Sequence, residues 1–187
     1  MKIFYCSVVL LALVAFVLAV GILKPTFRFK NGIMHKQAMQ LTSSAFSEGQ
    51  TLPSRFSYGG GNVNPPLAWS GAPEGTRSFA LIMDDPDVPK GVGVPIWIHW
   101  IVFNIPSSAT GIPEAAHLVG VRGKGTSGSV DYYGPRPPDK EHRYFFRLYA
   151  LDSVLDLGEG ATAGELQTAM TGHILAKAAL MGRYAPN

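Results

Sequence analysis

The chain has 187 residues, of which 47% are hydrophobic and 16% charged, and its formal net charge is only +3. This near balance, without a dense run of lysine and arginine, argues against a nucleic-acid-binding protein. The only cysteine, Cys6, lies in an apolar N-terminal run, so the rest of the chain has no disulfide and no cysteine-based zinc site. The 21 glycines and 14 prolines favour a fold of strands and loops.

An uncharged apolar run extends from Ile3 to Leu23. It has about the 20 residues needed to cross a bilayer and is longer than a typical signal-peptide core. Residues 1–23 therefore predict a hydrophobic helix that acts as a transmembrane anchor, with a cleaved signal segment as the alternative. The protein is then membrane-anchored, or exported to the periplasm or outside if the leader is cleaved.

Residues 24–44 are polar, mixed and without a clear period, which predicts a linker. Lysine and arginine residues in this stretch favour a cytosolic C-terminal domain by the positive-inside rule, whereas a secretory signal implies the opposite side. Residues 45–187 are long enough for one domain with its own hydrophobic core.

Four apolar stretches of this domain predict β-strands. Residues 65–69 predict a short strand that ends in a turn, and residues 79–83 predict a short buried strand. Residues 96–105 are the most apolar stretch of the domain and predict a central strand of a sheet that is buried on both faces. In residues 142–151, alternation places His142 and Tyr144 on one face.

The C-terminal region predicts a helix. Thr162 and Glu165 have the spacing of a capping box. Leu166, Met170, Ile174 and Ala178 then recur every four residues, as on an amphipathic helix, and Gly182 is a natural stop.

Two acidic residues follow the strand at 79–83, because Asp85 and Asp87 flank Pro86. The prolines stiffen this turn and hold the carboxylates in place, although an ordinary turn with solvated carboxylates has the same pattern. In the next strand, alternation places His99 on one face with Trp97, Ile101 and Phe103. A histidine there is either a satisfied core residue or opens onto a cavity.

These polar residues, with His142 and Tyr144, are typical of a small-molecule site, in which a few polar groups converge in an apolar cavity. Histidine and tyrosine can donate to phosphate oxygens, and aspartate can accept from an ammonium group. A divalent metal held by histidine and aspartate is less favoured, because neither an H-E-x-x-H motif nor a close histidine pair is present. The glycine-rich stretch at 123–127 lacks the P-loop spacing. No nucleophile or leaving group is identified, so catalysis is also less favoured.

Four blocks of sequence together resemble the phosphatidylethanolamine-binding protein family, and more narrowly its bacterial Raf-kinase-inhibitor-like branch. The blocks are FALIMDDPDVP, IWIHWIVFNIP, YYGPRPP and HRYFFRLYALD, with NPPLAWSGAPEGT upstream and GHILAKAALMGRY at the end. The resemblance runs from about Phe46 to Tyr184. It implies a mainly β fold, an antiparallel β-sandwich with a few peripheral helices, here preceded by the predicted N-terminal hydrophobic helix.

The resemblance also implies a small anion pocket at one edge of the fold. Carried onto this sequence, the ligand-binding residues are Asp85, Asp87, Trp97, His99, Gly134, Pro137, Pro138, His142 and Tyr144. A cis peptide bond is implied between Val88 and Pro89. The chain departs from the family pattern at Val94, where many eukaryotic members have tyrosine, and in a shorter loop at 138–142 that lacks a glycine.

We therefore expect a non-catalytic binding or regulatory protein that takes a phosphorylated small molecule or a phospholipid head group and has no metal and no cofactor. The alternatives are a protein-interaction module that inhibits a kinase or hydrolase as its partner, and a phosphoester hydrolase.

Overall fold

The computed structural model describes residues 38–117 and 119–186. The predicted membrane helix or signal segment at 1–23 and most of the predicted linker lie outside these residues. Among the residues described, none of the helices has the length and apolar character needed to cross a membrane. Strand β1, Gln40–Thr42, falls at the end of the stretch predicted as a linker, and Leu41 is buried in the core. This part of the predicted linker is therefore strand.

The fold is mainly β, with two antiparallel sheets, as the sequence predicts. The three-stranded sheet has the order β1-β2-β5, where β2 is Leu67–Ser70 and β5 is Gly111–Ile112. The five-stranded sheet has the order β6-β4-β3-β7-β8. Its strands are β3 (Ser78–Asp85), β4 (Trp97–Pro106), β6 (Val121–Gly123), β7 (His142–Leu151) and β8 (Ile174–Tyr184). The described residues contain one α-helix, α2 (Ala163–Met170), and one 3-10 turn, η1 (Ser54–Phe56).

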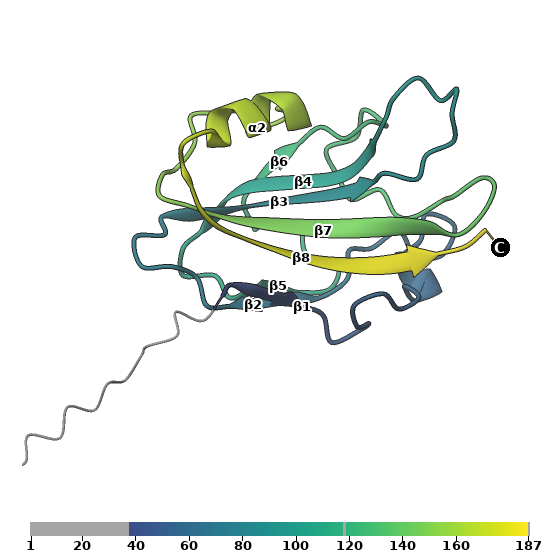
Figure 1. The fold of residues 1–187 in the computed structure, drawn as a ribbon, viewed down its shortest axis with the longest axis horizontal. Coiled ribbons are helices and arrows are strands. Elements are labelled where there is room, and N and C mark those ends of the chain that lie inside the picture. Colours follow the sequence, from purple (N-terminus) through teal and green to yellow (C-terminus); the bar gives the residue numbers. More distant parts are fainter. Residues whose placement is uncertain (1–37, 118, 187) are drawn as a thin grey trace, which may run out of the picture. The chain divides into compact units, whose positions relative to one another are not determined.

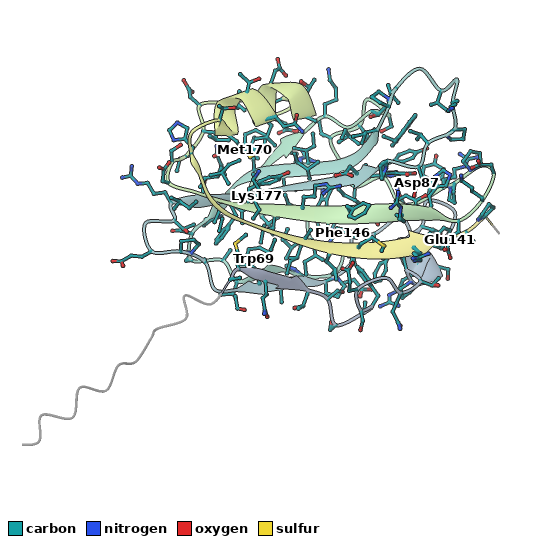
Figure 2. The ribbon with its side chains drawn as sticks, viewed as in Figure 1. Trp69, Asp87, Glu141, Phe146, Met170 and Lys177 are labelled. Atoms are coloured by element: carbon teal, nitrogen blue, oxygen red, sulfur yellow. The ribbon has the colours of Figure 1, made fainter. Side chains whose placement is uncertain are left out.

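The five-stranded sheet is covered on both faces. In Figure 1 the three-stranded sheet lies on one side of it and α2 on the other, and Figure 2 shows Trp69 and Met170 on these opposite sides. We call the face toward the small sheet the inner face; it carries Leu81 and Phe146 into the main core. The opposite, outer face packs Ile82 beneath α2. All eight residues of β3 are buried, which explains why this stretch is so apolar.

The C-terminal helix is much shorter than the sequence predicts. The capping box of Thr162 and Glu165 is present, but α2 ends at Met170. Gly172 has a φ of +83°, and the chain then enters β8 at Ile174. From Ile174 to Leu180 the side chains alternate between more and less buried positions, so the four-residue spacing concealed a period of two. The predicted helix is therefore wrong beyond Met170.

A bulge in β4 changes the face on which His99 lies. Met83 pairs with Trp100 and Asp84 pairs with Ile98, which leaves His99 as an extra residue opposite β3. As a result, Ile101 and Phe103 pack on the outer face. The His99 ring instead meets Tyr144 of the inner core, at 5.2 Å between ring centroids. The predicted face shared by His99, Ile101 and Phe103 is wrong, because the bulge shifts the alternation by one residue.

Candidate functional site

Three strand ends meet at one end of the large sheet, because neighbouring strands are antiparallel. Strand β3 ends at Asp85, β4 begins at Trp97 and β7 begins at His142. A cavity of about 160 Å³ opens there, and its walls come from these strand ends and from the loops at 86–96 and 124–141. The lining residues are Asp85, Val88, Pro89, Val92, Trp97, His99, Tyr133, Arg136, Pro137, Pro138, His142 and Tyr144.

Most of the residues predicted for the site lie around this cavity although they are far apart in the sequence. The residues that line it are Asp85, Trp97, His99, Pro137, Pro138, His142 and Tyr144. Asp87 and Gly134 are not in its lining. The convergence follows from the sheet order, in which β3 lies between β4 and β7.

The floor of the cavity is an ion cluster around His142. Its Nδ1 lies 2.7 Å from Asp85 Oδ2, and its Nε2 lies 2.8 Å from Asp139 Oδ1. Because ionised carboxylates only accept, both ring nitrogens donate and the ring is an imidazolium. Burial opposes this charge, but the hydrogen bonds that His142 donates to Asp85 and Asp139 outweigh the burial and raise the pKa of His142. The cluster thus holds one cation between two anions.

His99 has a different character, because it is buried and bonds a neutral group. Its Nδ1 lies 2.6 Å from the carbonyl oxygen of Tyr133. Burial lowers its pKa to about 4, although the Tyr133 carbonyl and the charge of Asp85 favour the charged form. The ring is therefore neutral at neutral pH.

Two lining residues carry buried donors without a well-formed hydrogen bond. The Tyr144 hydroxyl and the Trp97 indole N–H are sealed from solvent and make no well-formed hydrogen bond within residues 38–117 and 119–186. Burial, the nearby charge of Asp85 and a hydrogen-bonding contact of poor geometry with the Asp85 carboxylate raise the pKa of Tyr144 well above its usual range, so the hydroxyl keeps its proton. Buried polar groups in proteins are nearly always paired. Trp69 Nε1 in the main core is also unpaired, but Tyr144 and Trp97 both line one cavity, where a ligand acceptor could pair with them.

Asp87, predicted as a ligand-binding residue, turns away from the cavity. Its carboxylate accepts from Nε and Nη2 of Arg143 at 2.8 and 2.7 Å, and this pairing lowers its pKa to about 2. Its own N–H donates to Asp85 Oδ1 at 2.7 Å. Figure 2 shows Asp87 and Glu141 at the same end of the large sheet. Asp87 therefore positions Asp85 and the loop rather than lining the site.

The cis bond implied between Val88 and Pro89 is not present, since the described residues contain no cis peptide bond. The chain turns here by local hydrogen bonds instead. Asp85 Oδ1 accepts from the N–H of Asp87, and Pro89 O accepts from the N–H of Val92.

Gly134 packs against residues 56–58, on the side of the 133–138 loop away from the cavity lining. Its N–H donates to Asn62 Oδ1 at 2.8 Å, and a Cβ at this position would meet the carbonyl oxygen of Phe56 at 2.3 Å. Only glycine allows the loop to approach residues 56–58 so closely. Gly134 thus sets the position of the lining residues Tyr133 and Arg136.

Tyr133 and Arg136 were not singled out from the sequence. Tyr133 stacks on Tyr58 with 4.6 Å between centroids, and Arg136 lies over the Tyr58 ring at 5.0 Å. Arg136 lines the cavity, and among the described residues no carboxylate forms an ion pair with it. The sequence could have pointed to them, because both residues directly adjoin the Gly-Pro turn, which the family resemblance implies as a wall of the pocket.

A second cavity of about 240 Å³ is lined by Asn64, Trp100, Arg122 and neighbouring residues. Two of its polar side chains, Asn64 and Arg122, are already engaged. Asn64 bonds Pro113 O and the N–H of Ala116, and Arg122 bonds Asp131 and Glu159. No group of three or more potential metal ligands exists among the described residues. The cavity at the strand ends is therefore the better candidate.

Comparison with known proteins finds relatives that cover most of the chain. A family model described as phosphatidylethanolamine-binding protein matches residues 42–185. A UPF0098 protein of Methanothermobacter thermautotrophicus is 47% identical over 152 residues, which cover 78% of this chain and 98% of the relative. A solved putative phosphatidylethanolamine-binding protein homolog, CT736 from Chlamydia trachomatis, is 46% identical with a TM-score of 0.78, covering 80% of this chain and 99% of that one. The solved structure of E. coli YbcL, described as a new member of the mammalian PEBP family, is 30% identical with a TM-score of 0.74. The match covers 81% of this chain and 100% of YbcL.

Proposed function

The chain belongs to the phosphatidylethanolamine-binding protein family, and we propose that it binds a phosphorylated small molecule or a phospholipid head group in the cavity at the strand ends. The observation that carries this proposal is the pair of buried donors, Tyr144 Oη–H and Trp97 Nε1–H, that line the cavity without partners. An unpaired buried donor costs about 1–3 kcal/mol. A phosphate offers acceptor oxygens in several directions and would relieve that cost.

The charges around the cavity support an anionic guest. Arg136 brings a guanidinium without a carboxylate partner among the described residues, whereas the His142 imidazolium is already paired with Asp85 and Asp139 and adds no free positive charge. Asp85 is negative, but its oxygens already accept from His142 and from the N–H of Asp87. The site thus offers an anion more donors than free acceptors.

The size of the cavity limits what enters it. Pockets for drug-sized ligands have volumes of about 300–1,000 Å³, whereas this cavity has about 160 Å³. A phosphate with a short substituent fits that volume. Acyl chains of a lipid would have to remain outside.

We propose binding rather than catalysis, because the lining contains no serine, threonine, cysteine or lysine to serve as a nucleophile. His142 is bonded at both nitrogens and has none left to act as a general base, whereas His99 is bonded only at Nδ1.

Isothermal titration calorimetry of the full chain with phosphoethanolamine tests the proposal. Tyr144→Phe removes one donor and should weaken binding about tenfold, because a hydrogen bond to a charged group is worth about 1.5–3 kcal/mol. Tyr149→Phe is the matched control, since Tyr149 lies on the outer face of β7 away from the cavity. Equal affinity in wild type and Tyr144→Phe would place any binding elsewhere, and absence of binding in the wild type would reject the proposal.

For localisation, we propose that residues 1–23 tether the domain to a membrane, or direct its export if they are removed. The support is their uncharged apolar length. Membrane fractionation, with sequencing of the N-terminus of the mature chain, separates the two. A mature chain that starts at Met1 and is fully recovered in the soluble fraction would contradict both.

A further inference from the structure

The proton on His99 has a fixed position. A carbonyl oxygen can only accept, so the 2.6 Å contact with Tyr133 O requires the proton to be on Nδ1. The N–H of Tyr133 donates back to the carbonyl oxygen of His99 at 3.2 Å, which holds the two residues in register. In a neutral ring, Nε2 then carries a lone pair and acts as an acceptor.

Nε2 of His99 faces no protein partner. It makes no hydrogen bond within the described residues, and unlike the Tyr144 hydroxyl it is not sealed from solvent. The ring lines the cavity, so a bound ligand can reach this nitrogen. The cavity therefore presents one open acceptor, Nε2 of His99, with the donors of Tyr144 and Trp97 buried in its wall.

The other titratable and charged groups around His99 supply no proton to it. From β3, Asp85 accepts two hydrogen bonds, and from β7, His142 gives both its protons to carboxylates. Tyr144 keeps its proton because burial raises its pKa. Arg136, from the loop before β7, is permanently charged. A fully ionised phosphate has only acceptor oxygens and would meet the Nε2 lone pair unfavourably.

We propose that the cavity takes the monoanion of a phosphate monoester, whose remaining P–OH proton is shared with Nε2 of His99. This inference rests on the proposed anion-binding function and specifies the ligand class. A monoester monoanion brings the required proton with it. A phosphodiester, such as the phosphate of an intact phospholipid, has no P–OH group and must take that proton from solvent onto His99.

The proton makes binding pH-dependent in a defined way. The second pKa of a phosphate monoester is about 6, so the monoanion becomes scarce above neutral pH. Affinity should then fall close to tenfold for each pH unit above about 7, with nearly one proton taken up from solvent per ligand bound at pH 8. His142 contributes to this uptake only above its own raised pKa, and the His99→Gln variant, which keeps His142, separates the two groups.

Calorimetric titration of the full chain with methyl phosphate and with dimethyl phosphate, from pH 5.5 to 8.5, tests the inference. Buffers of different ionisation enthalpy count the protons taken up. We expect proton uptake with methyl phosphate at pH 8, and binding of dimethyl phosphate at least about tenfold weaker at pH 7. His99→Gln, which can donate an amide N–H without a proton from solvent, should bind methyl phosphate without uptake. His173→Gln, at an exposed imidazole paired with Asp152, should keep it.

The outcomes are distinct. If methyl phosphate binds with unchanged affinity between pH 7 and 8.5 and without proton uptake, or if both esters bind equally well at pH 7, the proton-sharing inference is wrong while anion binding stands. If neither ester binds at any pH, the proposed function itself fails. The wild-type pH series decides between these results even if His99→Gln does not fold.

Discussion

Asp84 and Asp85 are neighbours on β3 and are almost equally buried, with 4% and 3% of their surface exposed. They point to opposite faces of the sheet. On the outer face, Asp84 forms a two-pronged ion pair with Nε and Nη2 of Arg147. On the inner face, Asp85 bonds His142 at the floor of the cavity. One sheet thus carries two buried carboxylates with different kinds of partner.

The partners differ in whether their charge is permanent. A guanidinium does not lose its proton in proteins, and its planar fork matches a carboxylate. Arg147 also lies over the Phe145 ring at 4.6 Å, so its position is fixed by packing. The imidazole of His142 can titrate, and it borders a cavity with unpaired donors. Burial of a carboxylate alone therefore does not mark a site; a titratable partner beside unmet donors does.

Breaking the outer pair should have the largest effect on stability. Arg147→Met keeps the apolar stem but leaves the buried Asp84 carboxylate without its cation, which costs about 3–5 kcal/mol. Urea unfolding of the full chain measures the loss. Arg143→Met is the control on the same face, because the Arg143–Asp87 pair is more exposed and should cost about 1 kcal/mol or less. Equal losses in the two variants would contradict the ranking by burial.

The buried His99 on the inner face should make the protein less stable in acid. The pKa of His99 is about 4 in the folded protein against an ordinary value of 6.5, so the unfolded chain binds more protons in this interval. The free energy of unfolding should therefore fall as the pH drops from 6.5 to 4, by about 3 kcal/mol at 1.36 kcal/mol per pH unit. His142, with its raised pKa, loses its contribution only as the pH rises above 6.5.

Urea unfolding at several pH values between 4 and 6.5 checks this slope. The lowered pKa of Asp87, about 2, affects stability only below its ordinary value of 3.8, outside this window. His99→Gln should flatten the profile, and the exposed His173→Gln should not. An unchanged slope in His99→Gln would show that other groups cause the acid loss.

The sequence predicted the β class and the three strands on which the site depends, because those stretches are apolar and bounded by turns. The blocks of family resemblance identified Asp85, His99 and His142 before any contact was known. The prediction of a C-terminal helix is wrong beyond Met170, because residues 174–180 fit both a four-residue and a two-residue period. These residues form a strand because they pair with β7.

The bulge in β4 and the partners of the two aspartates could not be predicted from the sequence pattern. The bulge at His99 depends on how β4 pairs with β3, and a single sequence carries no such pairing information. Asp87 and Asp85 have the same residue type and similar surroundings in sequence. Only the fold brings Arg143 to Asp87 and His142 to Asp85. The sequence could therefore predict that this turn contributes a carboxylate to the site, but not which of the two aspartates does so.

The smallest expected effect concerns the stability of the cavity itself. The Tyr144 hydroxyl is buried without a well-formed hydrogen bond among the described residues, so Tyr144→Phe should raise the free energy of unfolding of the unliganded protein by about 1 kcal/mol. Tyr132→Phe is the control, since the Tyr132 hydroxyl is also buried but donates to Phe56 O at 3.0 Å. Its loss should lower stability by about 1 kcal/mol. Opposite signs in urea unfolding would show that the inner face sacrifices stability to keep a donor ready for a ligand, whereas a loss in both variants would mean that the Tyr144 hydroxyl is satisfied within the folded protein.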